Sequence, residues 1–171
     1  MARMGVDRAM AGNRQAPDVD PAIRRARPAE AGALSALALR SKAHWGYDAE
    51  FLAACRDDLT ISADEITSSA IYVCDAEDAP AGFYRLLLQD DGVAELDDLF
   101  VDPAAMGQGI GGRLWRHAVA TAAHLGYSEM VWQSDPQAEG FYLAMGAQRA
   151  GESESTVTPG RMLPLMRYRL R

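Results

Sequence analysis

The stretch VDPAAMGQGIGGRLW, residues 101–115, places four glycines within the six positions 107–112. From residue 108 to 125 apolar side chains recur every three or four positions, which predicts a helix that stops at Gly126. The first amides of a helix have no partner within the helix and lie at the positive end of its dipole. The stretch therefore predicts a site where bare backbone N–H groups bind an anion such as phosphate.

The spacing of the glycines distinguishes between the known patterns of phosphate-binding loops. Gly107 and Gly112 fit a nucleoside-triphosphate loop, but Arg113 and Leu114 replace its lysine and hydroxyl residue. A dinucleotide pattern G-x-G-x-x-G is also met, with Asp135 as its distal acid, yet too few residues follow for a second nucleotide-binding half. A nucleotide-cofactor oxidoreductase is therefore kept only as a weaker alternative.

Length and composition indicate one globular domain. The chain has 171 residues, of which 49% are apolar and 24% charged. We expect residues 1–20 to form a flexible tail and residues 21–171 the single domain. The two cysteines, Cys55 and Cys74, stand in apolar stretches and are expected to be buried free thiols rather than a disulfide.

Net charge and hydropathy limit the classes of partner that the sequence favours. The net charge of -7 and the isoelectric point of about 4.9 argue against function through nonspecific binding of nucleic acid or anionic lipid. No run of about eighteen apolar residues is present, and the first 21 residues contain no apolar signal-peptide core. We expect a cytoplasmic protein with no membrane or nucleic-acid partner; a homodimer stays open.

The order of elements predicts an α/β fold. The segments 93–101 and 128–134 flank the helix 108–125, so they should pair in parallel by a crossover, whereas the strands before them form an antiparallel meander. The result is a mixed, mostly antiparallel twisted sheet flanked by helices. The remaining predicted elements are strands at 22–27, 68–76, 81–89 and 160–170, and helices at 29–40, from Asp48 and at 136–145, with residues 41–47 interrupting the first two helices.

Two motifs resemble those of one family. LFVDPAAMGQGIGGRLW, residues 99–115, is similar to the acetyl-CoA-binding motif [RQ]-x-x-G-x-[GA] of the GCN5-related N-acetyltransferase (GNAT) superfamily, with Met106 at its first position and Gly109 and Gly111 at its glycines. DPQAEGFYLAMGA, residues 135–147, resembles the family motif N-x-x-A-x-x-F-Y-x-x-x-G-F. In this second motif Ala138, Phe141, Tyr142 and Gly146 match, Asp135 replaces the asparagine, and Ala147 replaces the final phenylalanine.

The resemblance implies a GNAT fold and direct transfer of an acetyl group from CoA to a primary amine of a small molecule or a protein. Acetyl-CoA would be the co-substrate, and no metal is implied. Because Met106 departs from the motif, a catalytically degenerate acyl-CoA sensor is the alternative. The implied cofactor-binding residues are Leu99, Phe100, Val101, Met106, Gly107, Gln108, Gly109, Ile110, Gly111, Gly112, Arg113, Asp135, Ala138 and Tyr142.

The resemblance also suggests the catalytic groups. Tyr142 stands where the family places a hydroxyl that protonates the CoA sulfur; the alternative is a tyrosine that packs beside Phe141 with its hydroxyl at the surface. Glu95 and Asp98 are the candidate bases on the strand before the glycine loop. Strand alternation places Glu95 and Asp97 on one face and Asp98 on the other, unless a bulge intervenes. Alternatively, these acids do not act as a base: they make an exposed face of the strand hydrophilic, or they attract a cationic acceptor.

The candidate acceptor-binding residues lie in the interruption between the first two helices. His44, Trp45 and Tyr47 lie in the helix interruption and could form an aromatic wall for a cation, although Trp45 and Tyr47 could equally cap the core. Trp115 and Trp132 are interpreted as core residues. On the helix 108–125 we expect Arg116, His117 and His124 to form a solvated face, while Arg113 could approach a phosphate.

Overall fold

A seven-stranded sheet organises the part of the chain that the structure describes, a computed structural model covering residues 17, 20–89 and 91–171. The predicted tail 1–20 lies for the most part outside the described residues. The elements in chain order are β1 (Ile23–Arg25), α1 (Ala31–Ala43), α2 (Ala49–Cys55), α3 (Ala63–Ser68), β2 (Ala70–Ala76), β3 (Ala79–Leu88), β4 (Val93–Val101), α4 (Ile110–His124), β5 (Glu129–Gln133), α5 (Glu139–Ala144), β6 (Gln148–Glu154) and β7 (Met162–Arg169), with single 3-10 turns at Pro28–Glu30 and Pro103–Ala105.

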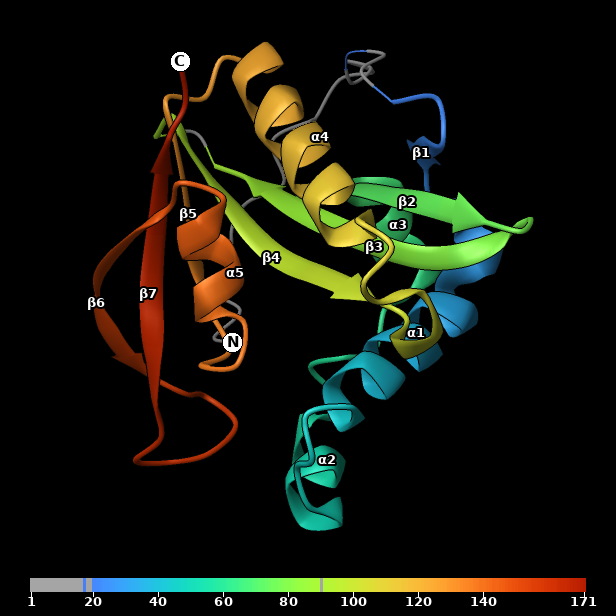
Figure 1. The fold of residues 1–171 in the computed structure, drawn as a ribbon, viewed down its shortest axis with the longest axis vertical. Coiled ribbons are helices and arrows are strands. Elements are labelled where there is room, and N and C mark those ends of the chain that lie inside the picture. Colours follow the sequence, from blue (N-terminus) through green and yellow to red (C-terminus); the bar gives the residue numbers. More distant parts are fainter. Residues whose placement is uncertain (1–16, 18–19, 90) are drawn as a thin grey trace.

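The sheet is mixed, as the sequence predicts. Its strand order is β1-β2-β3-β4-β5-β7-β6, and all neighbouring pairs are antiparallel except β4 and β5. The parallel pairing of β4 with β5 across α4 confirms the predicted crossover. This pairing is short, since it joins only Val93–Glu95 with Glu129–Val131. Beyond it β4 and β5 diverge, whereas β5 stays paired with β7 along its whole length (Figure 1).

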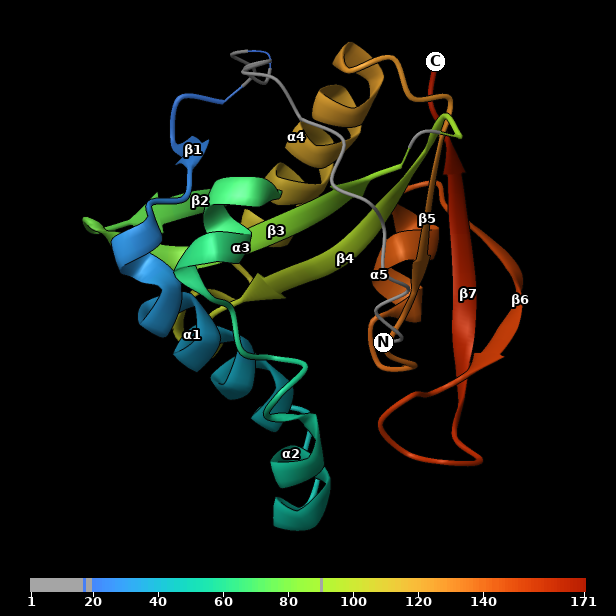
Figure 2. The same cartoon turned by 180° about the vertical axis from the view of Figure 1, so that it is seen from behind.

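Helices cover both faces of the sheet and enclose two cores. α4 and α5 lie on the face seen in Figure 1, and α1 and α3 on the face seen in Figure 2. The apolar face of α4 packs with the buried side chains of Tyr84 and Leu86 in one core. In the other core, Leu34 and Leu37 of α1 pack with Phe83. One apolar core therefore lies on each face of the sheet, and the second is confined to the side of β2, β3 and β4.

Three local predictions differ from the structure. α1 continues to Ala43, so Ser41 and Lys42 are helical rather than part of the interruption. α3 was not expected, although Ser62 and Glu65 form the reciprocal capping box that marks a helix start. β6 escaped prediction because it is an edge strand whose side chains are almost all exposed, so it has no apolar alternation.

The prediction of a solvated His117 is wrong. His117 is only 3% exposed, and its Nδ1 lies 2.7 Å from the Tyr84 hydroxyl, which also contacts Thr121. Burial lowers the pKa of His117, with partial compensation by the charge of Asp20. The position follows Ile110 by seven residues and Leu114 by three, so helical periodicity places it on the buried face.

The cysteines agree with a simpler expectation. Cys55 and Cys74 are buried free thiols, as predicted. Within the described ranges, no helix has both the length and the apolar character needed to span a membrane.

Candidate active site

A cleft of about 560 Å³ opens where β4 and β5 separate. Its walls come from the ends of these two strands, the glycine loop before α4, the start of α5, the α1–α2 region and the segment between β6 and β7. Leu99, Phe100 and Val101 line it from β4, and Trp132 and Gln133 from β5. A strand edge that has left its neighbour can pair with an extended ligand through backbone hydrogen bonds.

The glycine loop forms one end of the cleft. Gly109 is the N-cap of α4, and Gly107 and Gly109 both have φ of +79°, which side chains rarely tolerate. A Cβ at either position would meet no protein atom within 4 Å, so the backbone there borders open space. Met106, Ile110, Gly111 and Gly112 also line the cleft. The helix start is thus exposed to the cleft as the sequence predicts.

Two residues expected in the cofactor set do not line the cleft. Gln108 is directed toward the carbonyl of Ala104, at 3.3 Å from its side-chain nitrogen. Arg113 is paired with Asp20, with both of its contacts at 2.7 Å. The pairing lowers the pKa of Asp20 to about 2, chiefly through the Arg113 hydrogen bond. The side chain of Arg113 thus holds the segment before β1 against α4. It does not line the cleft beside the glycine loop.

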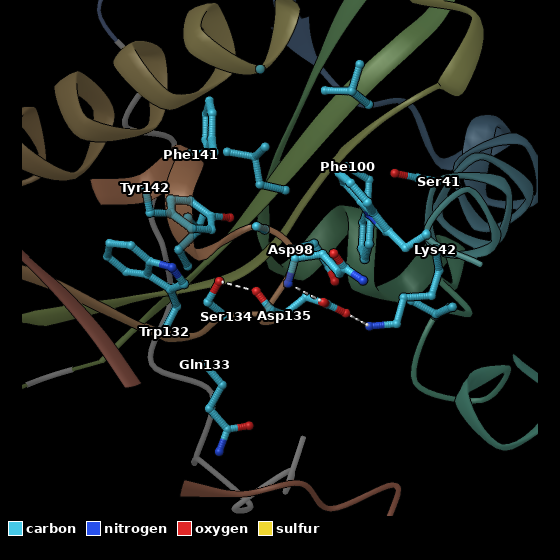
Figure 3. Close-up of a pocket in the computed structure, with 18 of the residues that line it drawn as sticks. Ser41, Lys42, Asp98, Phe100, Trp132, Gln133, Ser134, Asp135, Phe141 and Tyr142 are labelled. Atoms are coloured by element: carbon cyan, nitrogen blue, oxygen red, sulfur yellow. Dashed lines mark hydrogen bonds and ion pairs between the residues drawn. The ribbon is translucent and has the colours of Figure 1, made fainter. Parts of the chain in front are cut away.

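Tyr142 projects from α5 into the cleft. Its side chain is 6% exposed, and its ring packs against Trp132, Phe141 and Trp115 at centroid distances of 4.9, 5.1 and 5.5 Å. Figure 3 shows the hydroxyl directed toward the middle of the cleft rather than to the outer surface. Burial, and then the charge of Asp98, raises the pKa of Tyr142 above its ordinary value. The hydroxyl is therefore protonated at neutral pH.

A β-bulge sets the direction of the acids on β4. Arg85 faces Asp98 and the next residue of β3, Leu86, faces Leu96, so Asp97 is an extra residue in β4. Simple alternation would separate Asp97 from Asp98, but the bulge turns both carboxylates toward Arg85. The exception anticipated for this strand therefore holds: the bulge places Asp98 on the same face of the sheet as Asp97 and Glu95.

Arg85 is the centre of a buried charge cluster. Its Nε lies 2.8 Å from Asp98 Oδ2, its Nη2 lies 2.5 Å from Asp97 Oδ2, and its Nη1 donates to Glu65 Oε1 at 3.2 Å. The side chains of Arg85, Asp97 and Asp98 are each less than a tenth exposed. Burial raises the pKa of Asp98 to about 7, because Arg85 only partly offsets the burial and the charges of Asp97 and Glu65 add to it.

The two candidate bases are placed differently. Asp98 lines the cleft together with Asp97. Glu95 does not line the cleft; its carboxylate accepts a 3.3 Å hydrogen bond from Gln89. Burial raises the pKa of Glu95, with a further contribution from Asp97. The structure therefore brings Asp98, and not Glu95, into the same cleft as Tyr142.

Asp135 holds the far end of the cleft together. Its carboxylate accepts from Lys42 at 2.5 Å and from the Tyr47 hydroxyl at 2.8 Å, and Arg161 lies 3.7 Å away (Figure 3 shows Lys42 and Asp135). Burial acts to raise the pKa of Asp135, but the hydrogen bond and charge of Lys42 outweigh it, so the pKa lies below its ordinary value. This predicted cofactor residue thus ties β5 to α1 and to the segment before β7.

Aromatic residues also line this end. Trp45 is 39% exposed and lines the cleft, while the rings of Tyr47 and Phe51 pack at 4.4 Å and carry Lys42 and Arg161 about 5 Å from their centres. Burial raises the pKa of Tyr47 to about 12. His44 contacts Trp45 but does not line the cleft. Trp45 is thus a wall residue, whereas Tyr47 is a hydrogen-bonded bridge.

Sequence reasoning missed Arg85, Lys42 and Arg161. Arg85 had a detectable signal, because a lone charge within the apolar strand GFYRLLL (82–88) requires a buried partner. Lys42 stands in the predicted interruption 41–47, which gives no sign of a buried partner, and Arg161 lies in a connection without a sequence pattern. Trp132 was correctly placed in the core, yet it also lines the cleft. The two Trp rings, Trp115 and Trp132, pack edge to face at 5.2 Å.

Comparison with known proteins identifies the family. The model of the acetyltransferase (GNAT) family matches residues 37–147, more than half of the chain. A protein named peptidyl-lysine N-acetyltransferase YjaB, from Salmonella typhimurium, is 41% identical over 78 residues. That match spans 46% of this chain and about half, 49%, of that relative.

Solved structures support the same fold. A GCN5-related N-acetyltransferase from Rhodopseudomonas palustris superposes with a TM-score of 0.73 at 19% identity, covering 93% of this chain and all of that one. PaiA N-acetyltransferase from Thermoplasma acidophilum, solved in complex with coenzyme A, gives a TM-score of 0.67 at 20% identity over 86% of this chain and 97% of that one. The predicted fold is confirmed, and the chain belongs to the acetyltransferase (GNAT) family.

Proposed function

We propose that this chain is an acetyl-CoA-dependent N-acetyltransferase that moves an acetyl group directly from the CoA sulfur to a primary amine of a small molecule or a protein. Family membership supports acetyl transfer. The observation that carries the proposal for this chain is that Asp98 and the Tyr142 hydroxyl share one cleft at the separation of β4 and β5. Transfer of an acetyl group from a thioester to an amine that starts as ammonium needs one group to accept the ammonium proton before attack and one to donate a proton to the leaving sulfur.

The cleft fits CoA, which has an extended amide-containing arm and a diphosphate. The backbone around Gly107 and Gly109 leaves space that a side chain would fill, at the positive end of α4. The edge of β4 at Leu99, Phe100 and Val101 offers backbone groups to the arm. Bound there, acetyl-CoA supplies an activated acetyl group. Since Met106 offers only an apolar side chain, backbone amides would provide the diphosphate contacts.

The chain's own groups divide the remaining work. The Asp98 carboxylate would take the proton from the acceptor ammonium, directly or through water, and a pKa of about 7 suits a base at neutral pH. The Tyr142 hydroxyl would donate its proton to the departing sulfur. A main-chain amide of the segment 99–101 would hold the carbonyl oxygen in place. Glu95, outside the cleft, is the weaker candidate base.

Two observations support a primary amine as the acceptor. Trp45 and Phe51 give the acceptor end apolar walls, and the acids of β4 lie nearby. The partial relative is named as acting on peptidyl-lysine. A primary amine on a peptide or a small molecule fits both features. We also propose a single domain over residues 21–171 and a cytoplasmic location.

The test is thiol release from acetyl-CoA with an amine panel: a lysine-containing peptide, a peptide with N-terminal alanine, spermidine and a free amino acid. We expect at least one amine to accelerate release, with an acetylated product detected by mass spectrometry. Calorimetry with acetyl-CoA and with NADH accompanies the assay. Binding of acetyl-CoA without amine-stimulated release would instead support the sensor, and binding of NADH alone the oxidoreductase.

Gly109→Val tests the glycine cradle. The side chain would enter the space at the start of α4 and strain a backbone with φ of +79°, so we expect acetyl-CoA to bind at least about tenfold more weakly. Gly126→Val is the matched control, since Gly126 ends the same helix with φ of +89° and also has open space around it, outside the cleft. Equal affinities of the two variants would contradict the cradle.

A further inference from the structure

We propose that Arg85 and Glu65 are positioning residues that set the protonation of Asp98, and thereby the pH range in which the acetyl transfer runs. The inference rests on the proposed function, because it assigns Asp98 the role of the base. Neither residue lines the cleft. Both would act through the charge cluster behind β4.

The geometry gives each nitrogen of the guanidinium a different carboxylate. Asp98, Asp97 and Glu65 contact Nε, Nη2 and Nη1 of Arg85 at 2.8, 2.5 and 3.2 Å. Asp98 therefore shares the one guanidinium that contacts it with two other carboxylates. A change in the charge of Arg85 or of Glu65 should therefore change how readily Asp98 holds a proton.

Asp98 is the acid best placed to hold that proton. Its side chain is 9% exposed, whereas Glu65 is 22% exposed at the outer side of the cluster. The β4 bulge directs Asp97 to the same guanidinium, so Asp98 cannot have Arg85 to itself. Desolvation and two neighbouring carboxylates act in the same direction on Asp98.

The other charged groups around Asp98 are few. Tyr142, from α5, faces it across the cleft and feels its charge. Glu95, further along β4, also interacts with Arg85. On α1, the ammonium of Lys42 is held by Asp135. Arg85 is therefore the cation in contact with Asp98 within the described part of the chain.

The roles of Glu65 and Arg85 predict opposite shifts. Removal of the Glu65 charge would remove repulsion and leave more of the guanidinium to Asp98, so Asp98 should titrate at lower pH. Replacement of Arg85 by lysine would leave one ammonium to serve three acids, so Asp98 should titrate at higher pH. At an effective dielectric constant of about 20 to 40, adding or removing one charge within the cluster should move the titration midpoint of Asp98 by roughly half to one pH unit or more.

Glu65→Gln is the main variant because it should fold. Glu65 Oε2 accepts the capping hydrogen bond from the backbone of Ser62, and glutamine serves equally well in a capping box. Glu30→Gln is the matched control: Glu30 is also a capping-box glutamate paired with arginines, at Arg24 and Arg27, and lies outside the cleft. Arg85→Lys supplies the opposite shift.

Two readouts separate this inference from the proposed function. The first is the titration of the Asp98 carboxyl carbon by NMR of protein labelled with [13C]aspartate, assigned with Asp98→Asn. The second is the acidic limb of kcat/KM for the fastest amine of the panel. We expect both midpoints to fall by about half to one pH unit in Glu65→Gln, to rise in Arg85→Lys, and to stay unchanged in Glu30→Gln.

The inference fails if Glu65→Gln and Arg85→Lys leave both midpoints at the wild-type value, or shift them in the same direction. It also fails if the Asp98 resonance moves while the kinetic limb stays fixed, because the cluster would then not govern the reaction. If no amine stimulates thiol release by the wild-type protein, the proposed function fails, whatever the NMR titration shows.

Discussion

Asp98 is a buried and Asp135 a partly buried carboxylate of the same cleft, and the charges around them are opposite. Asp98 shares one guanidinium with two other acids, and its pKa rises to about 7. Asp135 has the ammonium of Lys42, the hydroxyl of Tyr47 and nearby Arg161, and its pKa falls. Burial acts in the same direction on both acids. The ratio of cations to carboxylates therefore decides which one holds a proton near neutral pH.

This difference suggests separate duties for the two acids. A carboxylate that exchanges its proton near pH 7 can act as a base, whereas one that stays ionised in a hydrogen-bonded network holds elements in place. Asp135 joins β5, α1 and the segment before β7, three parts of the chain that meet at the acceptor end. We expect Asp98 to control turnover and Asp135 to control the shape of the cleft.

Asp98→Asn should have the largest effect. Asparagine keeps the size of the side chain but cannot accept a proton, so kcat for the best amine should fall by about 10²–10⁴-fold at pH 7.5. Binding of acetyl-CoA, measured by calorimetry, should change little because the thioester arm is expected on the backbone of β4. A residual rate within about threefold of wild type would reject Asp98 and return attention to Glu95.

Tyr142→Phe should have the next largest effect. The substitution removes the hydroxyl but keeps the ring packing against Trp132 and Phe141, so we expect kcat to fall by roughly 10- to 100-fold with little change in cofactor affinity. Thiol release at saturating acetyl-CoA measures the effect. Phe141→Leu, a change in the adjacent ring that carries no hydroxyl, provides a comparison for altered packing. An unaltered rate in Tyr142→Phe would exclude the acid role.

Asp135→Asn should act mainly on stability. It would remove the charge that holds Lys42, so we expect unfolding to become easier by about 1–3 kcal/mol at pH 7, measured by chemical denaturation. Since the pKa of Asp135 is lowered in the folded state, its contribution is present above its unfolded value near 4 and lost as the pH falls through the folded value. The variant and the wild type should converge in acid; a constant difference would contradict this origin.

A further prediction concerns the pH dependence of stability that comes from Asp98. Its folded pKa is raised to about 7, so between the unfolded value near 4 and pH 7 the native state binds the extra proton and this contribution to stability declines as the pH rises. Asp98→Asn should remove that decline, whereas Asp135→Asn should not. Thermal unfolding of both variants at pH 5 and pH 8 provides the measurement. Parallel pH profiles for Asp98→Asn and the wild type would indicate that Asp98 does not titrate in this range.

The fold was predictable to a large extent because its signals are local. Apolar periodicity indicated α4, and the order of segments 93–101, 108–125 and 128–134 required the parallel pair of β4 and β5. The glycine loop indicated an exposed helix start, which Gly109 provides. β6 could not be predicted in the same way, since an exposed edge strand needs no apolar alternation.

The site was predictable only where a side chain's role follows from its own segment. Tyr142 could be found from its motif, and it does project into the cleft. Arg113 could not, because its partner Asp20 is 93 residues away in the sequence. The choice between Glu95 and Asp98 also lay beyond the sequence, since the bulge that directs the acids is a matter of register with β3.

The sequence alone determined where the helices and strands of the sheet centre form and that a glycine backbone borders open space at the start of α4, because these depend on neighbours within a few residues. Tertiary structure decided the charges of the cleft. Arg85, Glu65 and Asp98 come from three separate segments of the chain, and so do Lys42, Tyr47 and Asp135. The proton affinity of a buried acid depends on which charges the fold brings within a few ångströms of it.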